Sequence, residues 1–129
     1  MSTSDKLSLY KQVELDARVH GASPHKLILM LFDGALAALE GAKLAIENAD
    51  IQRKSEYINH VSSILAGLRD SLNVDVESDL PNQLDRLYEY MQRQVFEVHV
   101  RNDCQQLEEI QRLLLTVKSG WSGISADVS

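Results

Sequence analysis

The sequence has a single cysteine, no excess of basic residues and no long apolar run, and each absence excludes a class of protein. Cys104 stands alone, so the chain has neither a disulfide framework nor a Cys-x-x-Cys metal or redox pair. The formal net charge is −6, and Lys6, Lys11 and Arg18 are scattered among acidic residues. Because phosphate backbones are bound by basic surfaces, this charge argues against a nucleic-acid partner.

Membrane and secretion signals are missing as well. No apolar run reaches the roughly 18 residues that indicate a transmembrane helix, and residues 1–6 lack the basic and apolar regions of a signal peptide. We therefore expect a cytoplasmic protein with no membrane partner. The 129 residues are 44% hydrophobic and 25% charged, which is typical of a globular domain. We expect one domain over residues 1–129, with frayed tails at 1–6 and 125–129.

Motifs for catalysis or cofactor binding are also absent from the sequence. Di-iron helical bundles use Glu-x-x-His motifs, whereas this chain offers only Glu97-x-His99 and Glu56-x-x-x-His60. No glycine-rich loop is present to hold a phosphate group. We therefore expect no metal, no cofactor and no enzymatic activity.

A histidine phosphotransfer domain is an alternative, because such domains are also small acidic helical bundles. Their typical motif is His-x-x-Lys-Gly on an exposed helix face. The stretch after His60 reads Val-Ser-Ser-Ile and lacks the Lys-Gly pair, and no other histidine supplies it. His20 and His25 lie on either side of a predicted turn, where we expect polar surface residues. A small bundle without catalytic motifs is usually an interaction module.

The longest amphipathic stretch predicts a helix from Pro24 to about Asn48. Ser23 can cap its first turn, and proline is favourable at the first helical position. At about 100° per residue, one side collects Ile28, Leu31, Ala35, Leu39, Ala42 and Ile46, and the opposite side carries Lys26, Asp33, Glu40 and Glu47.

The apolar arc of this helix is wider than a single core face needs. Leu29 and Leu36 lie on one flank of the arc, and Met30 and Leu44 lie on the other. Either the helix has neighbours on both sides, or part of the arc is a docking groove for another chain. The two interpretations are compatible, and the pattern alone does not separate them.

A second helix is predicted over residues 51–73, with Asp50 as its N-cap. Its polar face includes Lys54 and Ser63. Its core positions are Tyr57 or Ile58, Val61, Ile64 or Leu65, Leu68 and Leu72. The stretch 74–79 loses the helical period and is the longest predicted loop.

Two more helices follow that loop. The third starts one or two residues before Pro81, and its heptad seam consists of Leu84, Tyr88, Met91, Val95 and Val98. Asp103 and Gln106 resemble a capping box at the start of the fourth helix, which weakens near Trp121 and has Leu107, Ile110, Leu114 and Val117 at core positions. Among these residues we expect five to be mostly buried, namely Leu68, Leu84, Met91, Ile110 and Leu114.

No stretch shows the alternation of a strand, so the predicted fold is all-α: an antiparallel up-down four-helix bundle with a short extra N-terminal helix. That short helix has Leu7, Tyr10 and Val13 at helical spacing and is too short to be stable alone. We expect it to pack over the part of the apolar arc led by Leu27 and Leu31. It is either a permanent cover or a movable lid.

A set of short motifs runs along the whole chain in order. They are Tyr10, Ala22-Ser23-Pro24-His25-Lys26-Leu27-Ile28, Met30-Leu31-Phe32-Asp33-Gly34-Ala35, Ile64-Leu65, Gly67-Leu68-Arg69, Ser71-Leu72-Asn73, Leu84, Leu87-Tyr88, Tyr90-Met91, Asn102-Asp103 and Gly120-Trp121. In this order and spacing the sequence resembles the FliS family of flagellar export chaperones. Phe32 stands where that family more usually has tyrosine, and Leu80-Pro81 replaces a more acidic, glycine-bearing approach to the third helix.

The resemblance implies a cytoplasmic chaperone of the flagellar type III export system. Such chaperones bind the disordered C-terminal segment of flagellin, prevent premature polymerisation and help deliver flagellin to the export gate protein FlhA, and some also contact the anti-sigma factor FlgM. An amphipathic client helix can lie in a groove between chaperone helices.

The predicted partner-binding residues come from the N-terminal segment and the apolar arc: Leu7, Tyr10, Val13, Leu27, Leu29, Met30, Leu31 and Leu36. A bundle with a purely structural role, without a flagellin client, is the other alternative. A pull-down with a flagellin C-terminal peptide distinguishes these possibilities.

Overall fold

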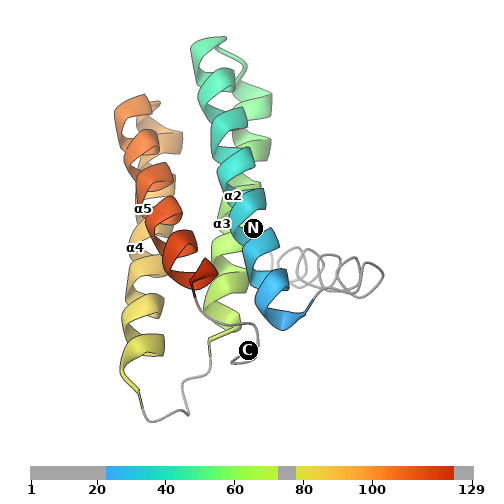
Figure 1. Cartoon of the computed structure of the whole chain (residues 1–129). Coiled ribbons are helices and arrows are strands. Elements are labelled where there is room, and N and C mark those ends of the chain that lie inside the picture. Colours follow the sequence, from blue (N-terminus) through green and yellow to red (C-terminus); the bar gives the residue numbers. More distant parts are fainter. Residues whose placement is uncertain (1–22, 73–77, 124–129) are drawn as a thin grey trace.

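The computed structural model describes residues 23–72 and 78–123, and these ranges form four α-helices. In chain order the helices are α2 (Pro24–Glu47), α3 (Ile51–Asp70), α4 (Leu80–Arg101) and α5 (Cys104–Ser122). Successive helices run in opposite directions (Figure 1). Helices α2 and α4 each pack against both α3 and α5, as in an up-down bundle. The all-α prediction is confirmed, whereas the predicted N-terminal helix lies outside the described residues.

Polar side chains begin three of the four helices. Ser23, Asp50 and Asp103 each accept a hydrogen bond from the amide three residues further on, at 3.1 to 3.2 Å. These bonds satisfy amides that a first turn leaves unpaired, so the helices begin where the sequence predicts. Only half of the predicted capping box forms, because the Gln106 side chain donates to Glu97 at 2.8 Å instead of back to the N-cap.

Residues at the C-terminal ends of α4 and α3 explain where these two helices end. Asn102 adopts a left-handed conformation with φ of 56° after α4, a conformation that asparagine tolerates better than most residues. Helix α3 ends at Asp70, earlier than predicted. There the Ser71 hydroxyl donates to the Leu68 carbonyl oxygen at 2.7 Å. The Leu68 carbonyl oxygen thus accepts from a side chain as well as from the backbone. Such a side-chain bond competes with the helical hydrogen bonds and favours the end of the helix.

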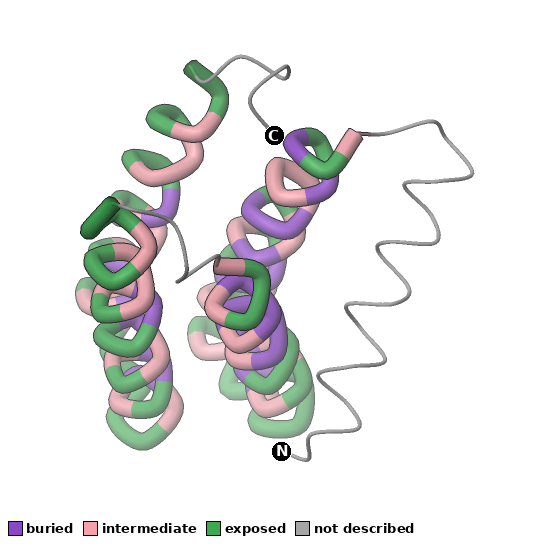
Figure 2. Tube along the Cα trace, turned by 90° about the horizontal axis from the view of Figure 1, so that it is seen from below, coloured by how far each residue is buried: buried purple, intermediate pink, exposed green. Residues whose placement is uncertain are grey.

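The core lies inside the bundle, and all four helices contribute buried residues to it (Figure 2). Four of the five side chains expected to be mostly buried are confirmed: Leu68, Met91, Ile110 and Leu114. Leu84 is only partly buried and packs against the core cluster from its edge. Phe32 is fully buried and was absent from the predicted core. It lies one turn after Ile28 and two turns before Leu39, so the helical period does place it on the core side.

Lys54 is buried, which corrects its predicted place on the polar face of α3. Only 9% of the residue is exposed. Its Nζ donates to the His99 carbonyl oxygen at 3.0 Å and to Asn102 Oδ1 at 2.7 Å. A cation at the C-terminal end of a helix is favourable because the last carbonyls point toward it. Lys54, a residue of α3, therefore caps the C-terminal end of α4.

Candidate functional site

The predicted partner-binding residues that the structure describes lie on the first half of α2. Leu29, Met30 and Leu36 are half-buried, whereas Leu27 and Leu31 are buried. Leu7, Tyr10 and Val13 lie outside the described residues.

These α2 residues differ in what they pack against. Leu31 belongs to the core cluster, and Leu36 is packed against it. Leu29 and Met30 belong neither to that cluster nor to the residues packed against it, whereas Leu27 is a buried core residue with 8% of its surface exposed. The first two turns of α2 therefore carry apolar side chains that the described core does not use. We call Leu29 and Met30 the α2 apolar surface; the two residues lie about 100° apart, on the two flanks of the apolar arc.

Histidine and tryptophan close the bundle beside the α2 apolar surface. Among the described residues, His25 is 7% exposed, which corrects the prediction of a polar surface histidine. Its Nε2 lies 2.8 Å from the Trp121 carbonyl oxygen, and Trp121 Nε1 donates to the His25 carbonyl oxygen at 2.9 Å. The rings stack with centroids 5.2 Å apart and an interplanar angle of 14°. The sequence did hold a signal, since His25 lies two helical turns before Phe32 on the core side.

The polar side of α2, which carries Asp33 and Glu40, is linked to α5 by two side-chain contacts. Lys118 Nζ lies 2.6 Å from Asp33 Oδ1, and the Gln111 side chain donates to Glu40 at 3.0 Å. These contacts lie at the surface and are worth little individually. They show that α5 lies beside the polar side of α2. The end of the same helix, at Trp121, binds His25.

Arg69 links α3 to α4. Its guanidinium donates to both carboxylate oxygens of Asp85, at 2.7 and 3.2 Å, and to Gln92 Oε1 at 3.0 Å. The hydrogen bond from Arg69 is the main cause that lowers the pKa of Asp85, and it likewise raises the pKa of Arg69. A bidentate contact of this kind fixes the relative position of two helices.

The next features concern metal-ligating side chains and the cysteine thiol among the described residues. They contain no group of three or more histidine, cysteine and acidic side chains that could hold a metal ion. Burial, followed by the nearby Glu47 charge, raises the pKa of the Cys104 thiol, and a protonated thiol is a poor nucleophile. Within the same ranges no helix has both the length and the apolar composition that crossing a membrane requires.

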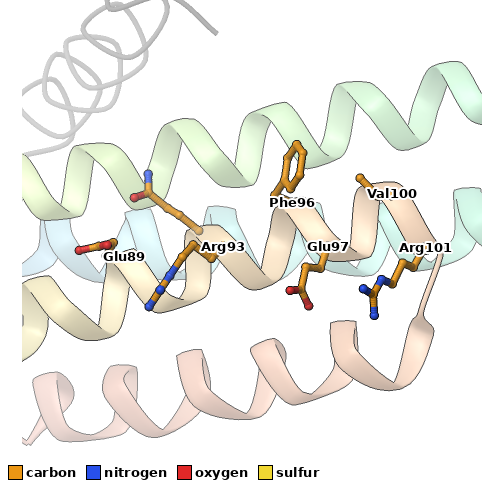
Figure 3. A pocket seen from close by; sticks show the side chains of 7 residues that line it. Glu89, Arg93, Phe96, Glu97, Val100 and Arg101 are labelled. Atoms are coloured by element: carbon orange, nitrogen blue, oxygen red, sulfur yellow. The ribbon is translucent and has the colours of Figure 1, made fainter.

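Sequence reasoning missed one surface on α4. Phe96 and Val100 are 67% and 61% exposed. They lie with charged residues in a shallow hollow of about 560 Å³ that only α4 residues line (Figure 3). The signal was present as two large apolar residues, one turn apart, outside the heptad seam of α4. We call this surface the outer face of α4.

Comparisons with known proteins agree on one family. The model of the family described as "Flagellar protein FliS" matches residues 6–128. The chain is 43% identical to the flagellar secretion chaperone FliSB of Pseudomonas aeruginosa over 116 residues, 90% of this chain and 92% of that protein. It is 37% identical to the flagellar secretion chaperone FliS of Salmonella typhimurium over 130 residues, 100% of this chain and 96% of that protein. Its identity to the Vibrio cholerae chaperone of the same name is 33% over 118 residues, covering 92% and 87%.

Proposed function

The chain belongs to the flagellar protein FliS family, and from that premise we propose that it is a cytoplasmic flagellar secretion chaperone that binds the C-terminal segment of flagellin. Binding of this segment prevents premature polymerisation, because flagellin subunits can no longer pair through it. The complex is then delivered to the flagellar type III export gate protein FlhA. Contact with the anti-sigma factor FlgM is a further partner that the resemblance implies.

The observation that carries this proposal is the α2 apolar surface. Leu29 and Met30 are half-buried apolar residues on a long helix and belong neither to the core cluster nor to the residues packed against it. An amphipathic client helix buries its apolar face by lying against such a surface. In this arrangement Leu31 and Leu36 hold α2 on the core beneath the client. The N-terminal residues Leu7, Tyr10 and Val13 belong to the same proposed site.

The energetics favour an apolar contact surface over a polar one. A disordered client segment loses conformational entropy when it becomes helical, at a cost of about 2–5 kcal/mol. Burial of apolar surface offsets this cost at roughly 25 cal/mol per Å². No nucleotide is required in this scheme, since the client is exchanged between protein surfaces.

Substitutions on α2 test this site. Met30→Gln makes the surface polar at a half-buried position, and we expect binding of a fluorescent flagellin C-terminal peptide to weaken about tenfold, or about 1.4 kcal/mol. Ile51→Gln is the matched control, because Ile51 is 73% exposed at the start of α3, which follows the C-terminal end of α2, whereas Met30 lies near the N-terminal end of α2. Equal peptide affinities for the two variants would place the client elsewhere.

A further inference from the structure

The start of α2 and the end of α5 hold each other through one pair of residues. His25 lies in the first turn of α2, and Trp121 lies in the last turn of α5. The His25 ring donates from Nε2 to the Trp121 carbonyl oxygen at 2.8 Å, and the indole donates from Nε1 to the His25 carbonyl oxygen at 2.9 Å. The two rings also stack. Each hydrogen bond needs the side chain of one residue and only the backbone of the other, so the two bonds can be removed separately.

The core cluster does little to hold these two helix ends. Leu114 is the last buried residue of α5, about two turns before the helix ends. The first α2 member of the core cluster is Leu31, about two turns after the helix starts, and of residues 24–30 only Ile28 packs against that cluster. Segments with few buried contacts open at a low free-energy cost. The α2 apolar surface therefore lies on a helix start whose position depends on the His25–Trp121 pair.

The local sequence of α5 does not favour a helix around Trp121. Gly120 precedes it and Gly123 follows at the C-cap, and glycine is the least favourable helix residue after proline. A Cβ atom at Gly120 would meet no other atom within 4 Å, so packing does not require a glycine there. The glycine leaves this helix end weaker than it could be, which makes the contacts to His25 more important for its order.

We propose that the His25–Trp121 pair regulates the client site. While the pair is closed, the start of α2 holds the α2 apolar surface in the geometry that binds the client, and when the pair opens the affinity for the client falls. This inference rests on the proposed client site on α2. His25 and Trp121 are positioning residues, since Trp121 belongs to α5 and acts on the site through His25. Because the coupling of two equilibria is reciprocal, a bound client in turn holds the pair closed.

Binding of a fluorescent flagellin C-terminal peptide to variants of the full chain tests the proposal. His25→Ala and Trp121→Ala each remove one of the two hydrogen bonds together with the stacking. Each should raise the peptide Kd about tenfold, because the client must then order the start of α2 itself. Since both variants open the same pair, the double variant should also lose about tenfold and not a hundredfold. Trp121→Phe keeps a ring for stacking and should recover part of the affinity that Trp121→Ala loses.

Lys54→Met is the matched control for a general loss of stability. Lys54 makes two comparable polar contacts, to the His99 carbonyl oxygen and to Asn102. They lie at the opposite end of the bundle, where α2 ends and α3 starts (Figure 1). The methionine keeps an apolar stem and removes both bonds, so this variant is less stable but leaves the start of α2 untouched. Its peptide Kd should equal that of the wild-type chain. Circular dichroism confirms that each variant is folded under the conditions of binding.

Hydrogen exchange of the Trp121 indole tests the reciprocal effect. Trp121 is the one tryptophan of the chain, so its Nε1 proton gives a single indole signal in the NMR spectrum. This proton exchanges with solvent only after its hydrogen bond to His25 has broken. A saturating peptide without tryptophan should therefore slow the exchange by about the same factor, roughly tenfold, by which loss of the pair weakens peptide binding. A pair that only stabilises the fold would not link the two factors.

Three results overturn the proposal while the wild-type chain binds the peptide: His25→Ala and Trp121→Ala variants that weaken binding no more than Lys54→Met does, losses that multiply in the double variant, and indole exchange that the peptide does not slow. A wild-type chain that does not bind the peptide at all refutes the proposed function, and with it the inference that rests on it. The behaviour of the wild-type chain therefore distinguishes the two failures.

Discussion

His25 and Trp121 are 96 positions apart in the sequence, yet each binds the backbone carbonyl oxygen of the other. A carbonyl oxygen only accepts, so His25 must carry a proton on Nε2. The pair joins the start of α2 to the end of α5. It therefore closes the bundle beside the proposed client surface, and its loss should affect both stability and the position of α2.

Replacement of His25 tests this closure. His25→Ala removes the hydrogen bond to the Trp121 carbonyl oxygen, which is only part-buried, and the ring stacking, so we expect a loss of about 1–3 kcal/mol in the free energy of unfolding. Urea denaturation measures this loss. His60→Ala is the control, because His60 is exposed on α3, and it should change stability by less than about 0.5 kcal/mol. Equal effects of the two substitutions would contradict the structural role of His25.

Two adjacent leucines of α5 test the register of that helix. Leu114 is fully buried, whereas Leu115 is exposed. Leu114→Ala should lower the free energy of unfolding by about 2–5 kcal/mol through lost transfer energy and a cavity, and Leu115→Ala by less than about 0.5 kcal/mol. Thermal or urea melts of the two variants give the answer. A melt unchanged by Leu114→Ala would show that the register of α5 is wrong.

The features that the sequence predicted correctly are local ones. Ser23 and Asp50 cap their helices through amides three residues away, and Leu114 is buried because of a heptad spacing that lies within one helix. Lys54 and His25 were misplaced because their partners come from other helices. Those contacts depend on which helix ends meet in space, and a helical period carries no information on that.

The candidate site shows the same division. The width of the α2 arc is readable from one helix, so Leu29 and Met30 could be singled out from the sequence. Sequence periodicity placed Leu29 and Leu36 on the same flank and could not show that Leu36 packs against the core cluster whereas Leu29 does not, because this depends on the packing of neighbouring helices. The outer face of α4 was missed because Phe96 and Val100 lie outside the seam on which the helix assignment rested.

Tyr88 predicts an alkaline limit to stability. Burial raises its pKa to about 12, above the ordinary value of 10.0. A group whose pKa is raised on folding contributes stability fully below the unfolded pKa and loses it as pH rises through the folded one. The free energy of unfolding should therefore fall between pH 10.0 and about 12, and Tyr88→Phe should make that fall shallower. Tyr90→Phe removes the same hydroxyl from an exposed ring and is the control; an equal slope for both would refute the assignment.

Tyr10 tests the N-terminal part of the proposed site. We expect Tyr10→Ala to leave the bundle folded, with near-unchanged circular dichroism, and to weaken a client or gate interaction by about 1–2 kcal/mol, roughly five- to thirtyfold. Hydrogen exchange distinguishes a movable lid from a fixed cover. If residues 7–17 are as protected as the long helices, with and without client, the segment is fixed and the lid hypothesis is wrong.

The central claim is that this chain binds the C-terminal segment of flagellin, and calorimetry with full-length and C-terminally truncated flagellin tests it most directly. The account predicts that full-length flagellin binds without ATP or divalent metal and that removal of the C-terminal segment abolishes the heat of binding. Truncation of the N-terminal end serves as the control and should leave binding intact. Undiminished binding to flagellin that lacks its C-terminal segment would contradict the account.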